Sequence, residues 1–210
     1  MPSTFKQILD KITTEKAPGP SPAFSVFHVL RAIELLAEKT IGRSRLTEEL
    51  KVGEGTIRTI ISRLKDAGLI KTSKLGCIIT DKGLKLWDEY KAVFRKKVEI
   101  EENELTLANH NFAILVKNRG HKVESGMKQR DAAIIVGARG ATTIIFKEGR
   151  LIIPYVSNDV AEDFPKATNQ IISLLQPEEN DVIVIVSGDG SEKAEYGALA
   201  AAWTLVNDGG

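Results

Sequence analysis

The sequence has 210 residues, of which 42% are hydrophobic, and this is enough for two small hydrophobic cores. The net charge of +1 gives the whole chain no preference for polyanions, and a single cysteine excludes an internal disulfide framework. The sequence contains neither the pattern of a signal peptide nor the roughly 18 apolar residues of a membrane span, so we expect a cytoplasmic protein.

Charge is distributed unevenly along the chain. Residues 1–97 hold 19 basic and 11 acidic side chains, a net charge of +8, whereas residues 98–210 hold 10 and 17, a net charge of −7. The first part attracts phosphate and the second repels it, which indicates a DNA-binding domain followed by a domain that does not bind DNA. We place the domain boundary at residue 98, where a basic segment gives way to an acidic one.

The first segment, residues 1–22, is predicted to hold a short helix and a connector. Apolar residues at helical spacing predict an amphipathic helix over Phe5–Ile12, which Ser3 and Thr4 can cap. Three prolines then prevent regular hydrogen bonding and make a semi-stiff connector: Pro18, Pro20 and Pro22.

Residues 23–98 have the pattern of a winged helix-turn-helix. A helix is expected over Ser25–Lys39, and a second, short helix contains Leu46 and Leu50. After a glycine-rich turn, a third helix begins near Thr56 and buries one stripe of side chains: Ile57, Ile60, Ile61 and Leu64.

A hairpin and a further helix complete this domain. Two short apolar runs, Leu69–Thr72 and Cys77–Thr80, are joined by a turn with a basic residue, which predicts a wing. Cys77 is expected to be a small buried hydrophobic residue in this wing. A helix capped by Thr80 and Asp81 is expected to continue to Val98.

The segment from about Phe24 to Val98 resembles the winged-helix domains of prokaryotic transcription regulators, including the MarR-like and iron-dependent repressor-like groups. The residues that carry the resemblance are Val52, Thr56-Ile57-Arg58-Thr59, Leu64, Ala67-Gly68-Leu69-Ile70 and Ile79-Thr80-Asp81-Lys82-Gly83. The whole chain is also similar to uncharacterised archaeal proteins with a winged helix before a domain of unknown function, and Arg139-Gly140-Ala141-Thr142-Thr143 contributes to this similarity.

The resemblance implies double-stranded DNA as the partner. Basic side chains near the helix-turn-helix and in the wing are expected to contact phosphates, namely Arg43, Arg45, Lys71 and Lys74. Polar side chains of the third helix are expected to face base edges in the major groove, namely Thr56, Arg58, Thr59, Ser62 and Arg63. A homodimer reading two half-sites is expected, joined through Tyr90–Val98 or the second domain.

Residues 99–210 predict a mixed α/β domain, so the chain is assigned to the α+β class. Strands are expected around Phe112–Val116, over Ala132–Gly137, Ala141–Phe146 and Leu151–Pro154, and over Asp181–Ser187 at the centre of the sheet. Two helices are expected, Asp163–Leu175 and the alanine-rich Ser191–Val206.

Two loops of this domain are candidate effector sites. Arg139 and Gly140 lie between two predicted strands, where a guanidinium and backbone amides could meet an anion. A second loop precedes a helix and contains Gly188, Asp189, Gly190 and Ser191. Alternatively, both are tight turns in which glycine supplies the backbone conformation.

No catalytic or cofactor motif is present, so we expect neither an enzyme nor a bound cofactor. A metal site built from His110, His121 and the nearby glutamates matches no ligand spacing, so no metal is expected either. The sequence therefore predicts a transcription regulator whose second domain senses a small effector or mediates dimerisation. The alternatives are a ligand-binding protein or enzyme with an accessory winged helix, and a protein-interaction module.

Overall fold

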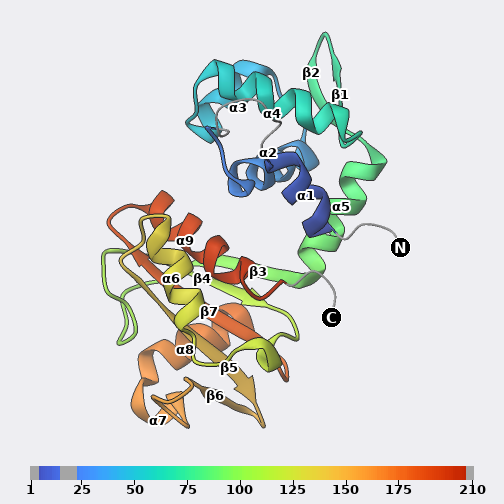
Figure 1. Cartoon of the computed structure of the whole chain (residues 1–210). Helices are drawn as coiled ribbons and strands as arrows, with labels where there is room; N and C mark the ends of the chain where they lie inside the picture. Colours follow the sequence, from blue (N-terminus) through green and yellow to red (C-terminus); the bar gives the residue numbers. More distant parts are fainter. Residues whose placement is uncertain (1–4, 15–22, 207–210) are drawn as a thin grey trace. The chain divides into compact units, whose positions relative to one another are not determined.

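The computed structural model describes residues 5–14 and 23–206, and the chain divides into two compact units, Met1–Tyr90 and Lys91–Gly210 (Figure 1). The predicted cap at Ser3 and Thr4 and the proline-rich connector lie outside the described residues.

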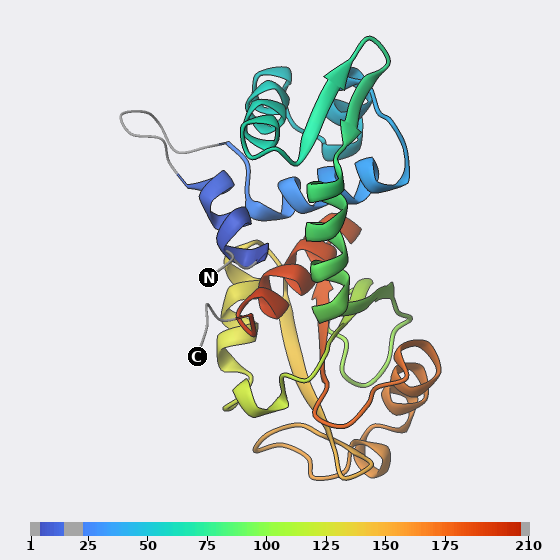
Figure 2. The same ribbon diagram turned by 90° about the vertical axis from the view of Figure 1, so that its right-hand side faces the viewer.

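The first unit has the element order of a winged helix. Its elements are α1 (Phe5–Thr13), α2 (Val26–Glu38), α3 (Arg43–Leu50), α4 (Glu54–Asp66), β1 (Ile70–Ser73), β2 (Gly76–Ile79) and most of α5 (Asp81–Val93). Figure 2 shows β1 and β2 side by side as a hairpin. The core is formed by one apolar stripe from each helix and includes Leu9, Ile33, Leu46, Ile57 and Leu64, each at most 1% exposed. The predicted winged helix is confirmed.

The helix predicted to reach Val98 ends at Val93. Residues Phe94–Glu99 form strand β3, which pairs antiparallel with β4 (His110–Val116). The ring of Phe94 is buried and stacks on Trp203, with 6.0 Å between ring centroids. The helix prediction was wrong here because strand pairing and burial of Phe94 outweigh the local helix propensity of the lysine-rich sequence.

The second unit contains one antiparallel sheet with strand order β3-β4-β7-β5-β6. The remaining strands are β5 (Gly140–Lys147), β6 (Arg150–Ile152) and β7 (Val182–Gly188). All seven residues of β7 are buried, which confirms the predicted central strand. Its Ile183 and Ile185 lie in one core cluster with Ile171 and Leu175, while its Val186 lies on the other face, toward Gly197.

The second unit has more helices than the two expected. Besides the 3-10 turn Gly120–Lys122, the described residues contain α6 (Met127–Ile135), α7 (Val160–Asp163), α8 (Pro165–Leu175) and α9 (Ser191–Trp203). The helix expected from Asp163 begins instead at Pro165, because Phe164 has non-helical backbone angles, φ −138° and ψ 66°. No helix of the described residues is long and apolar enough to cross a membrane.

The strand expected over Ala132–Gly137 is the end of helix α6 and the turn after it. Ala133 is buried, whereas Ile135 is 84% exposed, so this apolar run is not buried as a strand in the core would be. A short apolar run fits either a helix or a strand, and only its packing decides between them. Helix α6 packs beside α9, as Figure 1 shows.

Candidate nucleic-acid interface

The helix-turn-helix is formed by α3, a three-residue turn and α4. Lys51 ends α3 in the left-handed conformation with φ of 50°, and Gly53, in an extended conformation, precedes α4. Helix α4 begins at Glu54, two residues before the expected start at Thr56. Leu50 and Ile57 are buried on either side of this turn and hold the two helices together.

The outer face of α4 carries most of the side chains predicted to read bases. Arg58, Thr59 and Ser62 are exposed, and Thr56 is half-buried. The guanidinium of Arg58 lies 3.4 Å from the carboxylate of Glu54, and both side chains are more than 60% exposed. An exposed pair of this length is weak, so Glu54 does not fix the position of Arg58.

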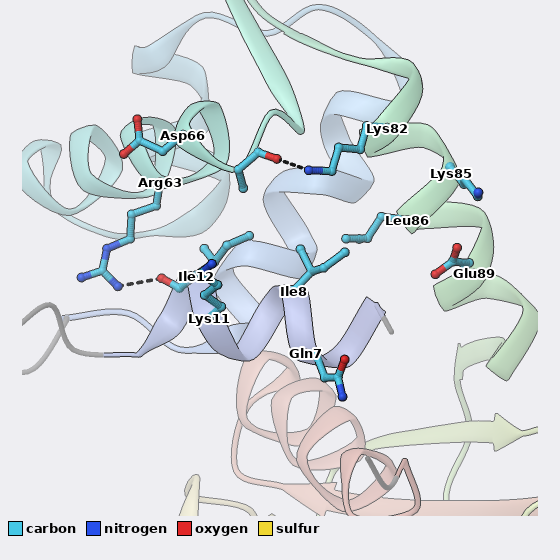
Figure 3. Close-up of a pocket in the computed structure, with 11 residues that line it drawn as sticks. Gln7, Ile8, Lys11, Ile12, Arg63, Asp66, Lys82, Lys85, Leu86 and Glu89 are labelled. Atoms are coloured by element: carbon cyan, nitrogen blue, oxygen red, sulfur yellow. Dashed lines mark hydrogen bonds between the residues drawn. The ribbon is translucent and has the colours of Figure 1, made fainter. Parts of the chain in front are cut away.

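Arg63, also predicted to face base edges, makes its hydrogen bonds away from this outer face. Its Nη1 donates hydrogen bonds to the backbone oxygens of Ile12, at 2.6 Å, and Thr14, at 2.9 Å (Figure 3). Its guanidinium also lies 5.3 Å from the centre of the Phe24 ring. Arg63 thus ties the end of α1 to α4, a role that the sequence of α4 alone could not reveal.

Replacing Arg63 with alanine is expected to release the end of α1 without changing base preference. Two charge-assisted hydrogen bonds are lost, so docking of α1 should weaken by about 2 kcal/mol. Hydrogen exchange of the α1 amides in the full chain would measure this, with Arg58→Ala as the control that leaves α1 protected. A relaxed base preference with unchanged exchange in α1 would contradict this role.

The predicted phosphate contacts come from two elements of the same unit. Arg43 and Arg45 lie in the first turn of α3. Both are exposed, and Arg45 binds the carboxylate of Glu49, with Nη2 at 2.8 Å. Lys71 and Lys74 are exposed in the β1–β2 hairpin.

The conformation of the wing depends on one glycine. Gly76 has φ of 129°, and a Cβ atom there would lie 2.6 Å from the backbone oxygen of Ile41. The neighbouring Cys77 is buried, as predicted, and burial raises the pKa of its thiol although Arg43 acts in the opposite direction. The close approach of Gly76 to Ile41 holds the wing against the segment that leads into α3.

The two candidate effector loops of the second unit lie together, although they are far apart in the sequence. Gly140 pairs with Ser187 where β5 meets β7, and the backbone amide of Arg139 donates to the oxygen of Ser187 at 2.8 Å. The Nε of Arg139 donates to Asp189 at 2.6 Å. Arg139 follows helix α6 rather than the expected strand, so the first loop is a helix-to-strand connection.

The remaining residues of these loops divide between core and surface. Gly140 and Gly188 are buried, and a Cβ atom on Gly188 would lie 2.8 Å from the backbone nitrogen of Ala194. Gly190 precedes α9, and Ser191 is its exposed first residue. Gly140 and Gly188 have a packing role, and the exposed polar groups are Ser191 and the hydrogen-bonded pair of Arg139 and Asp189.

Glu104, one of the glutamates considered as metal ligands, has a structural role. The carboxylate of Glu104 accepts hydrogen bonds from the backbone nitrogens of Lys166, at 3.0 Å, and Ala167, at 2.9 Å, in the first turn of α8. Desolvation alone would raise the pKa of this carboxyl, but backbone hydrogen bonds lower it below its ordinary value. Among residues 5–14 and 23–206, no group of three potential metal-binding side chains comes together.

The fold and the polar face of α4 define the first unit as a domain of the winged-helix class. The comparisons with known proteins agree, since residues 25–94 match the family model described as the CggR N-terminal DNA binding domain. This segment is therefore similar to a DNA-binding domain. Residues 107–205 match a domain of unknown function, DUF4443.

One solved structure extends the similarity over nearly the whole chain. It is a hypothetical protein from Pyrococcus horikoshii OT3, with 26% sequence identity and a TM-score of 0.67. The similarity covers 87% of this chain and 92% of that one. Comparison with curated proteins finds no match. The predicted similarity to an uncharacterised archaeal protein is therefore confirmed.

Proposed function

We propose that this protein is a transcription regulator that binds double-stranded DNA through its winged helix. The observation that carries the proposal is the exposed polar face of α4, with Arg58, Thr59 and Ser62, in a segment that matches a DNA-binding domain. A helix of this kind fits the major groove, where side chains distinguish base pairs by their hydrogen-bonding edges.

Affinity and specificity come from different residues in this proposal. Arg43 and Arg45 on α3 and the lysines of the wing neutralise phosphates, which favours binding to any duplex at low salt. Arg58 and its neighbours on α4 select among sequences. One winged helix makes a small interface, so we expect a two-fold dimer that reads two half-sites.

The second unit is proposed to sense a small effector or to mediate assembly, and its chemistry favours an anionic or hydroxylated ligand near Arg139. An incoming anion must compete with Asp189, whose hydrogen bond with Arg139 holds the pKa of that carboxyl below its usual range. This link between the loops is fully present above the ordinary pKa of aspartate and is lost as the pH falls through the lowered pKa. Exposed Tyr155 and Val156, after β6, support an assembly role.

Replacing Arg139 with alanine is expected to abolish the response to effector while leaving DNA affinity unchanged without effector. Removing this exposed pair should change the melting temperature little. DNA titrations of the full chain with and without a metabolite extract would measure the response, with Lys128→Ala as a control on an exposed lysine of the same unit. Loss of the folded second unit in Arg139→Ala would show instead that the loop is a structural turn.

The proposed function as a whole is tested by selecting bound fragments from genomic DNA with the full chain. We expect enrichment of a sequence with two related half-sites, and loss of that enrichment in Arg58→Ala. Binding that shows no sequence enrichment at any salt concentration would overturn the regulator proposal.

A further inference from the structure

A cavity of about 600 Å³ lies within the first unit, between α1, the end of α4 and α5 (Figure 3). Its apolar side is formed by Ile8 and Ile12 of α1 and Leu86 of α5, and Ile8 and Leu86 point toward one another in the figure. Ala67, at the end of α4, completes this side. The volume lies within the range of roughly 300–1,000 Å³ that is usual for small-molecule sites.

The charged side chains around the cavity have a positive balance. Lys11, Arg63, Lys82 and Lys85 contribute four positive charges, and Asp66 and Glu89 contribute two negative ones. Lys11 and Lys85 lie at the exposed edge, on α1 and α5. The chemistry of the rim thus favours an anion over a cation.

Two of these cations are held in place by backbone oxygens. The Nζ of Lys82 donates to the backbone oxygen of Ala67 at 2.7 Å, and Arg63 donates to the backbone oxygens at the end of α1. A carbonyl oxygen orients a charged group but does not cancel its charge. The ammonium of Lys82 also has three N–H donors, and this bond uses one of them. The cavity therefore combines positioned positive charge with an apolar surface.

We propose that this cavity binds an amphipathic organic anion. The aromatic or aliphatic body of the ligand lies on Ile8, Ile12 and Leu86, and its carboxylate or similar acidic group is bound by Lys82 and Lys85. Burial of the apolar body supplies binding free energy, and the lysines select for negative charge.

The position of the cavity connects this site with DNA binding. Its wall includes the end of α4, the helix whose outer face carries Arg58, so a ligand there contacts α1, α4 and α5 together. A ligand that prefers one position of α4 changes the affinity for DNA, and DNA changes the affinity for the ligand by the same factor. This consequence rests on the proposed function, whereas binding of the ligand does not.

The site is tested by calorimetric titration of the full chain with 2-naphthoate, in the absence of DNA. The uncharged 2-naphthamide has the same ring system and serves as the matched probe. We expect saturable binding of naphthoate, about tenfold weaker binding of the amide, and a similar loss in the double variant Lys82→Gln/Lys85→Gln. The control variant Lys128→Gln/Lys166→Gln removes two exposed lysines of the second unit and should bind naphthoate as the unmodified chain does.

Each outcome of this titration decides the proposal. Equal affinity of the two double variants, equal affinity for acid and amide, or no saturable binding up to about 10 mM naphthoate would overturn it. Because Lys82 also bonds to Ala67, the single variant Lys85→Glu provides a second test that leaves this bond intact, and it should likewise weaken naphthoate binding. If naphthoate binds as expected but leaves DNA affinity unchanged, the site stands and its coupling to α4 is overturned. Failure of the chain to bind DNA would overturn the proposed function and the coupling that rests on it, but not the ligand site.

Discussion

Replacing Gly83 with alanine is expected to destabilise the first unit by about 3 kcal/mol. Gly83 lies in α5, where a Cβ atom would be 2.3 Å from the backbone oxygen of Leu69 and 2.7 Å from Cγ1 of Ile79. The first of these neighbours is backbone at the start of the wing, so the overlap cannot be relieved by rotating a side chain. The helix and the wing must separate, and burial of Leu69 and Leu86 is weakened.

The same substitution at Gly55 is the matched control and has the opposite sign. Gly55 lies in the first turn of α4, and a Cβ atom there would have no neighbouring atom within 4 Å. Alanine there should stabilise the unit by up to about 1 kcal/mol, because it lowers the conformational entropy of the unfolded chain.

Urea denaturation followed by tryptophan fluorescence measures this difference. Trp87 lies in the first unit and Trp203 in the second, so a Trp203→Phe background isolates the first. Both substitutions are made in this background. Similar midpoints for Gly83→Ala and Gly55→Ala would show that α5 and the wing are not packed as described.

Replacing Arg58 with alanine is expected to weaken binding to the specific DNA site by about 1–3 kcal/mol and to relax base preference. Arg58 is exposed near the beginning of α4, and its weak pair with Glu54 leaves it free to donate two hydrogen bonds to a guanine. Removing it should cost little stability, because it makes no buried contact. The substitution should therefore change DNA recognition and not the stability of the fold.

Lys74→Ala is the comparison variant for this prediction. Lys74 lies in the exposed turn of the wing, and a phosphate contact there should strengthen binding to all sequences alike. Its removal should lower the affinity for all sequences by a similar factor. It should also reduce the slope of the logarithm of the binding constant against the logarithm of salt concentration by about one. Titrations of specific and random duplexes at several salt concentrations separate the two effects. Equal losses for both variants on both duplexes would refute the proposed division between base and phosphate contacts.

The sequence by itself determined the first unit nearly completely, because its signals are local. Ile57, Ile60 and Leu64 repeat at the period of a helix and pack one apolar stripe into the core. The turn before α4 and the hairpin of the wing are short connections marked by glycine. The central strand β7 was also readable, since an unbroken run of valine and isoleucine can be buried on both faces.

Sequence patterns predicted the wrong element where the same residues are compatible with a helix and with a strand. Ala132–Gly137 and Arg95–Val98 are compatible with either helix or strand, and each adopted the form that its neighbours stabilise: packing of α6 beside α9, and pairing of β3 with β4. Propensity differences of a few tenths of a kcal/mol per residue are smaller than the free energy of burying Phe94 or Ala133.

Only the tertiary structure decided which polar side chains act together. Arg63 is a basic residue of the helix predicted to face DNA, yet the backbone oxygens that it contacts belong to Ile12 and Thr14, about fifty residues earlier in the chain. Arg139 and Asp189 meet because β5 and β7 are neighbours in the sheet. The cavity beside α4 likewise combines side chains from three helices. Contacts between residues so distant in sequence leave no periodic pattern, because the chain between them can take any path that the fold allows.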